Sequence, residues 1–200
     1  MKYLDCFRFL AAHRGDAIVV TSAGNSGQAW WAATRDSERS FYLDASMSLS
    51  TLFGSGLALA LPQKRIWAFM GDGAFCMNPG MLMVERQLNL PNLTHFLVSN
   101  RAYGATSNAQ LPNADANDYA AIARGCGLTR VHTFASLAEL ERGFDAAVQK
   151  GHTFVVLEVE PFSAEEQRLE QPPFDGPEMK YRFARALERD TGTAIIGYRL

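Results

Sequence analysis

Short apolar runs alternate along the chain with longer stretches in which apolar residues recur at helical spacing. The apolar runs predict strands at Ala17–Thr21, Arg65–Met70, His95–Ser99, Arg130–Phe134 and Thr153–Val159, with Ser40–Leu43 as a shorter and weaker candidate. Several of these runs are almost continuously apolar, which is typical of strands that helices cover on both faces.

The stretches between these runs predict helices. They are Ser26–Thr34, Leu49–Leu61, Pro79–Leu88, Asp115–Cys126 and Ser136–Lys150. In the last of them Ser136 and Glu139 form a capping box before an apolar face. Strands that alternate with helices in this way predict an α/β fold, with a parallel sheet, helices on both of its faces and right-handed crossovers.

Two further segments bear on the domain organisation. The helix predicted at Leu49–Leu61 contains Gly54 and Gly56. Each interior glycine costs about 1 kcal/mol relative to alanine, so either the helix packs closely against another backbone or a ligand, or the segment is a loop. After Pro161 the chain becomes acidic and proline-rich before a last predicted helix at Glu178–Arg189. We therefore expect one domain over residues 1–162, and a C-terminal arm over 163–200 that packs on the domain or on a partner.

The composition narrows the class of protein. The 200 residues are 48% hydrophobic and 20% charged, which excludes a disordered chain, a collagen and a coiled coil. A net charge of −2 gives no basic surface for nucleic acid or an anionic membrane. Three widely spaced cysteines predict no disulfide framework and favour a reducing, cytoplasmic location. No apolar run is long enough to span a membrane, and charged residues near the N-terminus are unlike a signal peptide.

The strongest candidate for chemistry is Gly71-Asp72-Gly73, directly after a predicted strand. Ligands of parallel α/β sheets bind at the carboxyl ends of strands, which is where this tripeptide falls. Glycines let the backbone come close to a phosphate, and the carboxylate of Asp72 suits a hard cation such as Mg²⁺. A tight turn is the alternative interpretation of the same three residues.

A second polar group follows the next predicted strand. Asn100 lies one strand–helix–strand unit after Asp72, so two adjacent parallel strands would bring both oxygen donors to one edge of the sheet. Taken alone, Asn100 is better explained as a turn or cap residue than as a ligand. The correctly spaced pair favours a cation site.

Gly71-Asp72-Gly73 followed by Ser99-Asn100 resembles the thiamin diphosphate–magnesium motif. The resemblance implies that Asp72, Asn100 and the carbonyl of Ala102 hold Mg²⁺. Ser99 departs from the motif, because the family has an asparagine there, but the family's metal ligand is the second residue of the pair.

The same resemblance implies a set of cofactor-binding residues. They are Gly24, Asn25, Ala45, Ser46, Met47, Gly71, Gly73, Ala74 and Tyr103. In this family Gly73 and Ala74 would face the diphosphate, Asn25 would touch it from the other side, and the carbonyl of Ala45 would receive the aminopyrimidine. Met47 would support the bent cofactor; without the motif it would be interpreted as a core methionine that fills a gap.

Within this superfamily the chain is most similar to the decarboxylases of sulfopyruvate and phosphonopyruvate. The similarity is carried by Ser46-Met47 with residues 56–62, by Asn100 with residues 102–106 and, more weakly, by residues 175–183. It implies a thiamin diphosphate- and Mg²⁺-dependent decarboxylase that acts on a small anionic 2-oxoacid. Two alternatives stay open: a carboligase of the acetolactate synthase type, and a non-catalytic partner that binds a diphosphate.

The resemblance also implies that half of the active site is elsewhere. In the family, a glutamate on a separate pyrimidine-binding domain activates the cofactor, whereas this chain predicts a single α/β unit. Glu85, Glu158 and Glu160 are better explained as structural or surface residues, and Arg101 as a solvent-facing loop residue. We therefore expect a pyrimidine-binding (alpha) subunit as partner, in an assembly of two copies of each chain or larger.

Overall fold

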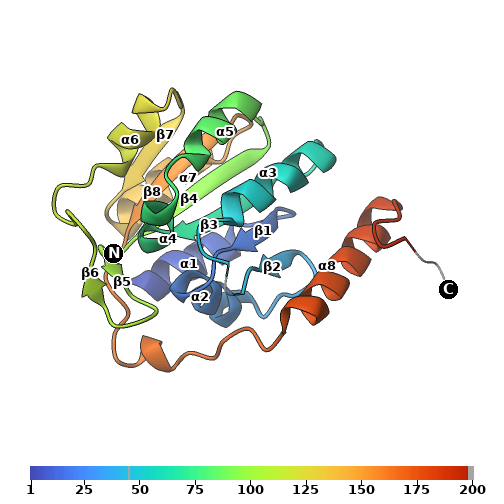
Figure 1. The fold of residues 1–200 in the computed structure, drawn as a ribbon, viewed down its shortest axis with the longest axis horizontal. Coiled ribbons are helices and arrows are strands. Elements are labelled where there is room, and N and C mark those ends of the chain that lie inside the picture. The colour runs from blue at the N-terminus through green and yellow to red at the C-terminus, as the bar shows by residue number, and fades with distance from the viewer. Residues whose placement is uncertain (45, 198–200) are drawn as a thin grey trace.

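The computed structural model describes residues 1–44 and 46–197. Its centre is a sheet of six parallel strands, in the order β2-β1-β3-β4-β8-β7 (Figure 1). The strands are β1 (Ile18–Thr21), β2 (Ser40–Tyr42), β3 (Ile66–Gly71), β4 (Leu93–Ser99), β7 (Val131–Phe134) and β8 (Thr153–Glu158). The α/β class and all six predicted strands are confirmed.

Helices cover both faces of this sheet. They are α1 (Tyr3–Ala12), α2 (Asn25–Thr34), α3 (Ser50–Ala60), α4 (Asp72–Met77), α5 (Met81–Leu88), α6 (Tyr119–Gly125), α7 (Leu137–Ala147) and α8 (Gly176–Thr191). Successive residues of β3 point to opposite faces. Phe69 packs with Phe7 of α1 and Trp30 of α2, whereas Met70 belongs to a second cluster with residues of α4, α5 and α6.

Some elements differ from the predictions. Helices α1 and α4 and the two-stranded hairpin β5 (Ala102–Tyr103) and β6 (Ala109–Gln110) were not predicted. Helix α6 begins at Tyr119 rather than at Asp115, because Asp118 caps it by accepting a hydrogen bond from the backbone N–H of Ala121 at 2.8 Å. At α7, Ser136 accepts from the backbone N–H of Glu139, so the predicted cap forms.

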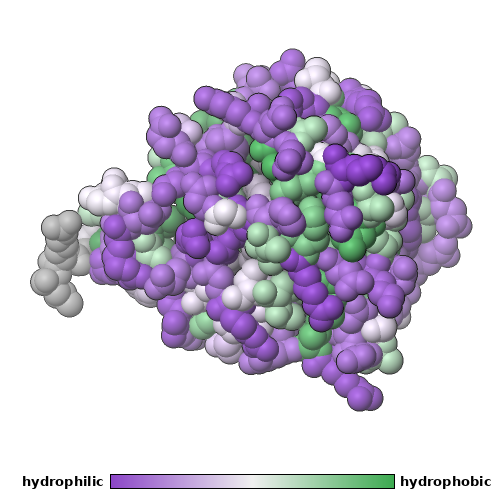
Figure 2. Space-filling model, turned by 180° about the vertical axis from the view of Figure 1, so that it is seen from behind, coloured by the Kyte–Doolittle hydropathy of each residue, from purple (hydrophilic) through white to green (hydrophobic). Residues whose placement is uncertain are grey.

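The C-terminal segment packs on its own domain. After a 3₁₀ turn at Glu166–Arg168, helix α8 lies along the β2 edge of the sheet, where Met179, Phe183 and Leu187 join the main core (Figure 1). Seen from behind, the molecule is mostly hydrophilic, with hydrophobic residues gathered near the middle of that face (Figure 2). No helix in the described parts of the chain is long and apolar enough to cross a membrane.

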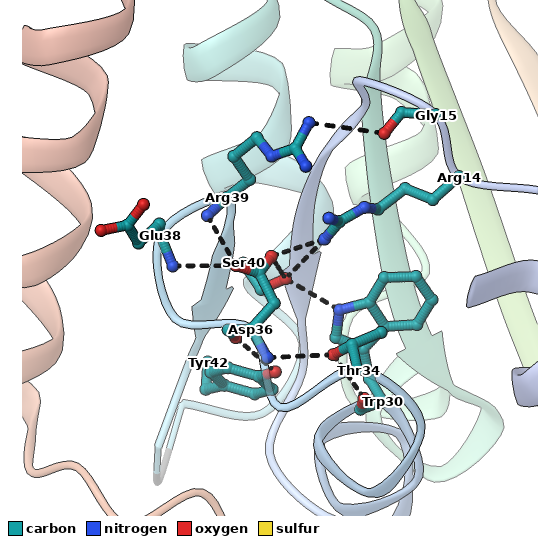
Figure 3. A network of polar contacts seen from close by, with 9 residues as sticks. All are labelled: Arg14, Gly15, Trp30, Thr34, Asp36, Glu38, Arg39, Ser40 and Tyr42. Carbon is teal, nitrogen blue, oxygen red and sulfur yellow. Dashed lines mark hydrogen bonds and ion pairs between the residues drawn. The ribbon is translucent and has the colours of Figure 1, made fainter. Parts of the chain in front are cut away.

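A polar network fixes the segment that leads into β2 (Figure 3). The Asp36 carboxylate accepts hydrogen bonds from Arg14 Nη1 at 2.5 Å and Ser40 Oγ at 2.7 Å, and Trp30 Nε1 donates to Ser40 Oγ at 2.8 Å. Burial opposes the charge on Asp36, but the hydrogen bonds from Ser40 and Arg14 outweigh it and lower the pKa of this carboxyl. The network therefore ties α1 and α2 to the edge strand.

Candidate functional site

A pocket opens at the carboxyl ends of β1, β3 and β4, which are neighbours in the sheet. Ten of the predicted site residues line it: Gly24, Asn25, Met47, Gly71, Asp72, Gly73, Ala74, Asn100, Ala102 and Tyr103. Ser46 precedes Met47 but does not line the pocket, and Ala45 lies outside the described residues. The sheet thus gathers residues from the four segments that follow β1, β2, β3 and β4, as expected for neighbouring parallel strands.

Asp72 is the buried acid of this pocket. Its Oδ1 accepts from the backbone N–H of Gly73 at 2.8 Å, and its Oδ2 accepts from Ser99 Oγ at 3.1 Å and from the backbone N–H of Arg101 at 2.6 Å. Burial raises the pKa of the Asp72 carboxyl to about 6 despite these hydrogen bonds. A bound cation would stabilise the charged form. Ser99, the departure from the motif, holds this carboxylate in place.

Two asparagines converge on the same point from different loops. A Cβ atom on Gly104 would lie 2.6 Å from Asn100 Nδ2 and 2.7 Å from Asn25 Nδ2, so only glycine leaves room for both amides. Asn25 is buried, and neither its Oδ1 nor its Nδ2 has a hydrogen-bond partner in the described parts of the chain. Buried polar groups are normally satisfied, so this amide is suited to a polar ligand.

The glycines of the Gly71-Asp72-Gly73 tripeptide serve different purposes. A Cβ on Gly71 would meet no atom within 4 Å, so this glycine leaves open space in the pocket. A Cβ on Gly73 would lie 2.8 Å from Tyr103 Cδ1, so Gly73 is required by the packing of that ring. Nearby, Gly24 has φ +99° and precedes α2. The backbone N–H of Gly27 donates to the Gly24 carbonyl at 3.0 Å, and the N–H groups of Asn25 and Ser26 ahead of it, at the N-terminus of the helix, suit an anion.

These donors fit Mg²⁺ together with a diphosphate. Within the described residues, no group of three histidine, cysteine or acidic side chains is arranged to hold a metal. A cation at Asp72 would therefore depend on one carboxylate, the amide of Asn100 and backbone carbonyls such as that of Ala102. Mg²⁺ is commonly held in this way, with few protein oxygens and several from phosphate and water.

Arg101 is not the solvent-facing residue that we predicted. Its guanidinium donates to Glu158 Oε1 at 2.6 Å and Oε2 at 3.2 Å, and to the carbonyls of Ala114 and Asn117 at 2.8 and 2.7 Å. It also lies over the ring of Tyr119. The correction has a physical cause: Arg101 adopts φ +62°, which turns the backbone N–H toward Asp72 and the side chain toward β8. Arg101 thereby couples the loop that follows β4 to Asp72.

Sequence reasoning missed Tyr3, which lines the pocket, and Gln167, which contacts the pocket residue Gly104. Tyr3 of α1 reaches the pocket and shares a 3.1 Å hydrogen bond with Ser26 Oγ, and Gln167 of the C-terminal arm donates to the carbonyl of Gly104 at 3.4 Å. The apolar spacing of Tyr3, Phe7 and Leu10 could have revealed α1. No local signal marks Gln167.

Among the described residues that line the pocket there is no glutamate, lysine or arginine. Glu85 of α5 is fully buried, and it accepts from His95 Nδ1 at 3.1 Å and pairs with His152 Nε2 at 3.2 Å. Burial alone would raise the pKa of Glu85, but the charge of His95 and the hydrogen bonds of both histidines lower it to about 2. Glu85 is therefore a structural residue, away from the pocket.

The sequence is similar to that of known proteins over most of its length. Residues 22–159 match the family model described as "Thiamine pyrophosphate enzyme, C-terminal TPP binding domain". The sulfopyruvate decarboxylase subunit beta of Methanocaldococcus jannaschii is 32% identical over 190 residues, which cover 94% of this chain and 98% of that protein. The sulfopyruvate decarboxylase of Methanosarcina acetivorans is 31% identical over 156 residues, which cover 76% of this chain and 40% of that protein.

A solved structure has the same fold. The thiamine diphosphate-dependent 4-hydroxybenzoylformate decarboxylase of Rhodococcus jostii RHA1 superposes with a TM-score of 0.68 at 20% identity. The match covers 80% of this chain but only 33% of that enzyme, so the chain spans about a third of its length. With a family model that matches most of the chain and a relative above 30% identity along nearly all of it, the chain belongs to the thiamine pyrophosphate enzymes and contains their C-terminal TPP-binding domain.

Proposed function

We propose that this chain is the diphosphate- and Mg²⁺-binding subunit of a thiamin diphosphate-dependent decarboxylase. The observation that carries the proposal is the convergence of Asp72, Asn100 and Asn25 in one pocket. This occurs in a chain that aligns from end to end with a protein named sulfopyruvate decarboxylase subunit beta. A small 2-oxoacid with a second anionic group, such as 3-sulfopyruvate or 3-phosphonopyruvate, is the proposed substrate.

Different residues of the pocket would bind different parts of the cofactor. Asp72, Asn100 and the carbonyl of Ala102 would hold the cation, while the α2 N-terminus and Asn25 would bind the diphosphate. Met47, exposed at the mouth of the pocket, would contact the rings of the cofactor. When bound, thiamin diphosphate supplies the electron sink that a 2-oxoacid needs to lose CO₂.

A partner chain would complete the site. The pocket lining of this chain offers neither a glutamate to activate the cofactor nor a cationic side chain for an anionic substrate. The relatives are consistent with this division. The same unit makes up nearly all of the protein named subunit beta in M. jannaschii, but only 40% of the M. acetivorans sulfopyruvate decarboxylase. We propose that a pyrimidine-binding subunit supplies the missing groups, in a complex with two copies of each chain or larger.

The experiment that tests the proposal starts from the tagged chain. It would be purified from its native cells, the co-purifying chain identified by mass spectrometry, and the two chains co-expressed. The pair should release CO₂ from 3-sulfopyruvate or 3-phosphonopyruvate only with thiamin diphosphate and Mg²⁺, and the isolated chain should not. Turnover by the isolated chain would contradict the proposal. Acetolactate formed from pyruvate would identify a carboligase instead, and a complex without turnover a non-catalytic binding partner.

A further inference from the structure

Helix α1 brings a hydroxyl to the pocket from outside the residues that the family model matches. The model matches residues 22–159, whereas Tyr3 is the first residue of α1 and lines the pocket. Helices α1 and α2 pack side by side (Figure 1). The hydroxyl of Tyr3 lies 3.1 Å from Oγ of Ser26, which is in the first turn of α2 and also lines the pocket. Both side chains are buried, so the two hydroxyls form a pair in the wall of the pocket.

The ring of Tyr3 is held by contacts that do not need the hydroxyl. It stacks on Phe7 with the ring centroids 5.2 Å apart, and it meets the ring of Phe162 edge-on at 4.6 Å. The C-terminal arm adds a tie to the same turn of α1, because Glu166 Oε1 accepts from the backbone N–H of Leu4 at 3.4 Å. A phenylalanine at position 3 would keep the ring contacts. The role of the hydroxyl is therefore separate from the packing of the ring.

The hydroxyl pair leaves one proton for a ligand. Each hydroxyl donates one hydrogen bond, and one of the two protons is used within the pair. A phenol is a stronger acid than an alcohol, so Tyr3 is the better donor and Ser26 the better acceptor. Burial raises the pKa of the Tyr3 hydroxyl, and the charge of Asp72 adds to this although the hydrogen bond with Ser26 opposes it, so Tyr3 stays protonated. The proton of Ser26 then remains for an acceptor in the pocket.

The surroundings of Ser26 indicate that this acceptor is an anion. The backbone N–H groups at the start of α2 suit an anion, and the neighbouring amide of Asn25 is unpartnered within the described residues. The described lining contains no lysine or arginine, so a diphosphate there would depend on the cation at Asp72 and on neutral donors. Hydrogen bonds from neutral donors to an anion are stronger than those between neutral groups. A hydroxyl with a fixed direction would therefore contribute to affinity.

We propose that Tyr3 is a positioning residue for the diphosphate: it donates to Ser26 Oγ and thereby directs the Ser26 hydroxyl toward a phosphate oxygen. The inference rests on the proposed function, because the ligand is the diphosphate of that cofactor. It adds α1 to the elements that set the affinity for the cofactor. The alternative is that the hydrogen bond between Tyr3 and Ser26 only joins α1 to α2, which the experiment must exclude.

The test removes single hydroxyl groups in the co-expressed pair of subunits. Tyr3→Phe removes the proposed donor and keeps the ring, and Ser26→Ala removes the hydroxyl that Tyr3 directs. Tyr42→Phe and Ser55→Ala are the matched controls. Both of these residues are buried, each hydroxyl donates to a backbone carbonyl, and neither residue lines the pocket.

Two ligands separate binding of the diphosphate from binding of the rest of the cofactor. Inorganic diphosphate and thiamin diphosphate, each with Mg²⁺, would be titrated calorimetrically into the wild type, the four single variants and the double variant Tyr3→Phe/Ser26→Ala. The melting temperature of each ligand-free pair would be measured by circular dichroism. Affinity and stability are thereby obtained independently of any turnover.

We expect Ser26→Ala to weaken the binding of both ligands about tenfold or more, and Tyr3→Phe to weaken it about three- to tenfold. Because Tyr3 acts through Ser26, Tyr3→Phe should cause no further loss when Ser26→Ala is already present. The controls Tyr42→Phe and Ser55→Ala should lower the melting temperature by a similar amount and leave both affinities unchanged. A hydrogen bond that only joined the two helices would not produce this pattern of affinities.

Each other outcome overturns a particular part of the account. If Tyr3→Phe lowers the melting temperature but changes neither affinity, or if its effect adds to that of Ser26→Ala, the inference is wrong and the proposed function is untouched. If the expected affinities are found but the pair decarboxylates no 2-oxoacid, the proposed function fails and the inference stands. If the wild-type pair binds neither ligand with Mg²⁺, both are wrong.

Discussion

Gly104→Ala is the substitution for which the structure makes the sharpest prediction. The new methyl group would lie 2.6 Å from Asn100 Nδ2 and 2.7 Å from Asn25 Nδ2, well inside van der Waals contact. Both neighbours are the ends of flexible side chains, so they can move aside at small cost to the fold. The asparagines would then leave the positions from which we propose that they bind the cation and the diphosphate.

The size of the effect follows from the contacts that are lost. Each displaced amide loses one hydrogen bond or ligand contact, worth about 0.5–1.5 kcal/mol net. Two amides together give about 1–3 kcal/mol, which is roughly a 5- to 150-fold loss of affinity for thiamin diphosphate with Mg²⁺. Thermal stability should change little, because no ring or backbone atom must shift.

Calorimetric titration of thiamin diphosphate into the assembled pair, with Mg²⁺ present, measures this loss. Gly125→Ala is the control, because a Cβ there meets no atom within 4 Å and lies outside the pocket. Gly73→Ala is the contrasting variant: its Cβ would meet the Tyr103 ring at 2.8 Å and should lower thermal stability as well. Unchanged affinity in Gly104→Ala would refute the convergence of Asn25 and Asn100 on the ligand.

Three other substitutions test separate parts of the structure. Arg101→Ala should lower the free energy of unfolding by about 1–3 kcal/mol in urea denaturation and weaken Mg²⁺-dependent cofactor binding. Arg101→Lys should lie between this variant and the wild type, because lysine lacks the planar guanidinium that donates to both carboxylate oxygens of Glu158. Equal behaviour of all three proteins would argue against the coupling of Arg101 to Asp72. The lowered pKa of Glu85 stabilises the fold above about pH 4.5 and this stabilisation is lost as the pH falls toward 2. Glu85→Gln should therefore flatten the acid side of the stability curve, and an unaltered slope would exclude this role. Met47→Ala should slow turnover of the pair without lowering its melting temperature, since Met47 is 37% exposed; wild-type kcat would leave Met47 without a role at the cofactor.

Much of the fold could be predicted because its signals are local. Apolar runs identified every strand of the six-stranded sheet. The central strands are buried on both faces and therefore consist mostly of apolar residues, which makes them easy to recognise in the sequence. Helix α4 escaped prediction because it is six residues long and begins inside the Gly71-Asp72-Gly73 tripeptide, which is also typical of a turn. The β5–β6 hairpin is two residues on each side, too short for any alternation of apolar and polar positions.

The sequence predicted the site residues that belong to the motif, but not the contacts that hold them in place. Asp72 and Asn100 could be paired because their strands are adjacent and parallel. The position of Arg101 depends on Glu158, far along the chain, and on a positive φ that a non-glycine residue rarely adopts. The requirement for glycine at 73 comes from Tyr103, which the hairpin folds back over it. Contacts of this kind are properties of the tertiary structure.

The central claim is that Asp72 holds a cation that fastens thiamin diphosphate to this chain. The most direct measurement is a calorimetric titration of thiamin diphosphate into the assembled pair, with and without Mg²⁺, for the wild type and for Asp72→Asn. We expect Mg²⁺-dependent binding in the wild type, and loss of that dependence in Asp72→Asn, which should still fold and pair. Equal Mg²⁺-dependent affinity in both proteins would contradict it.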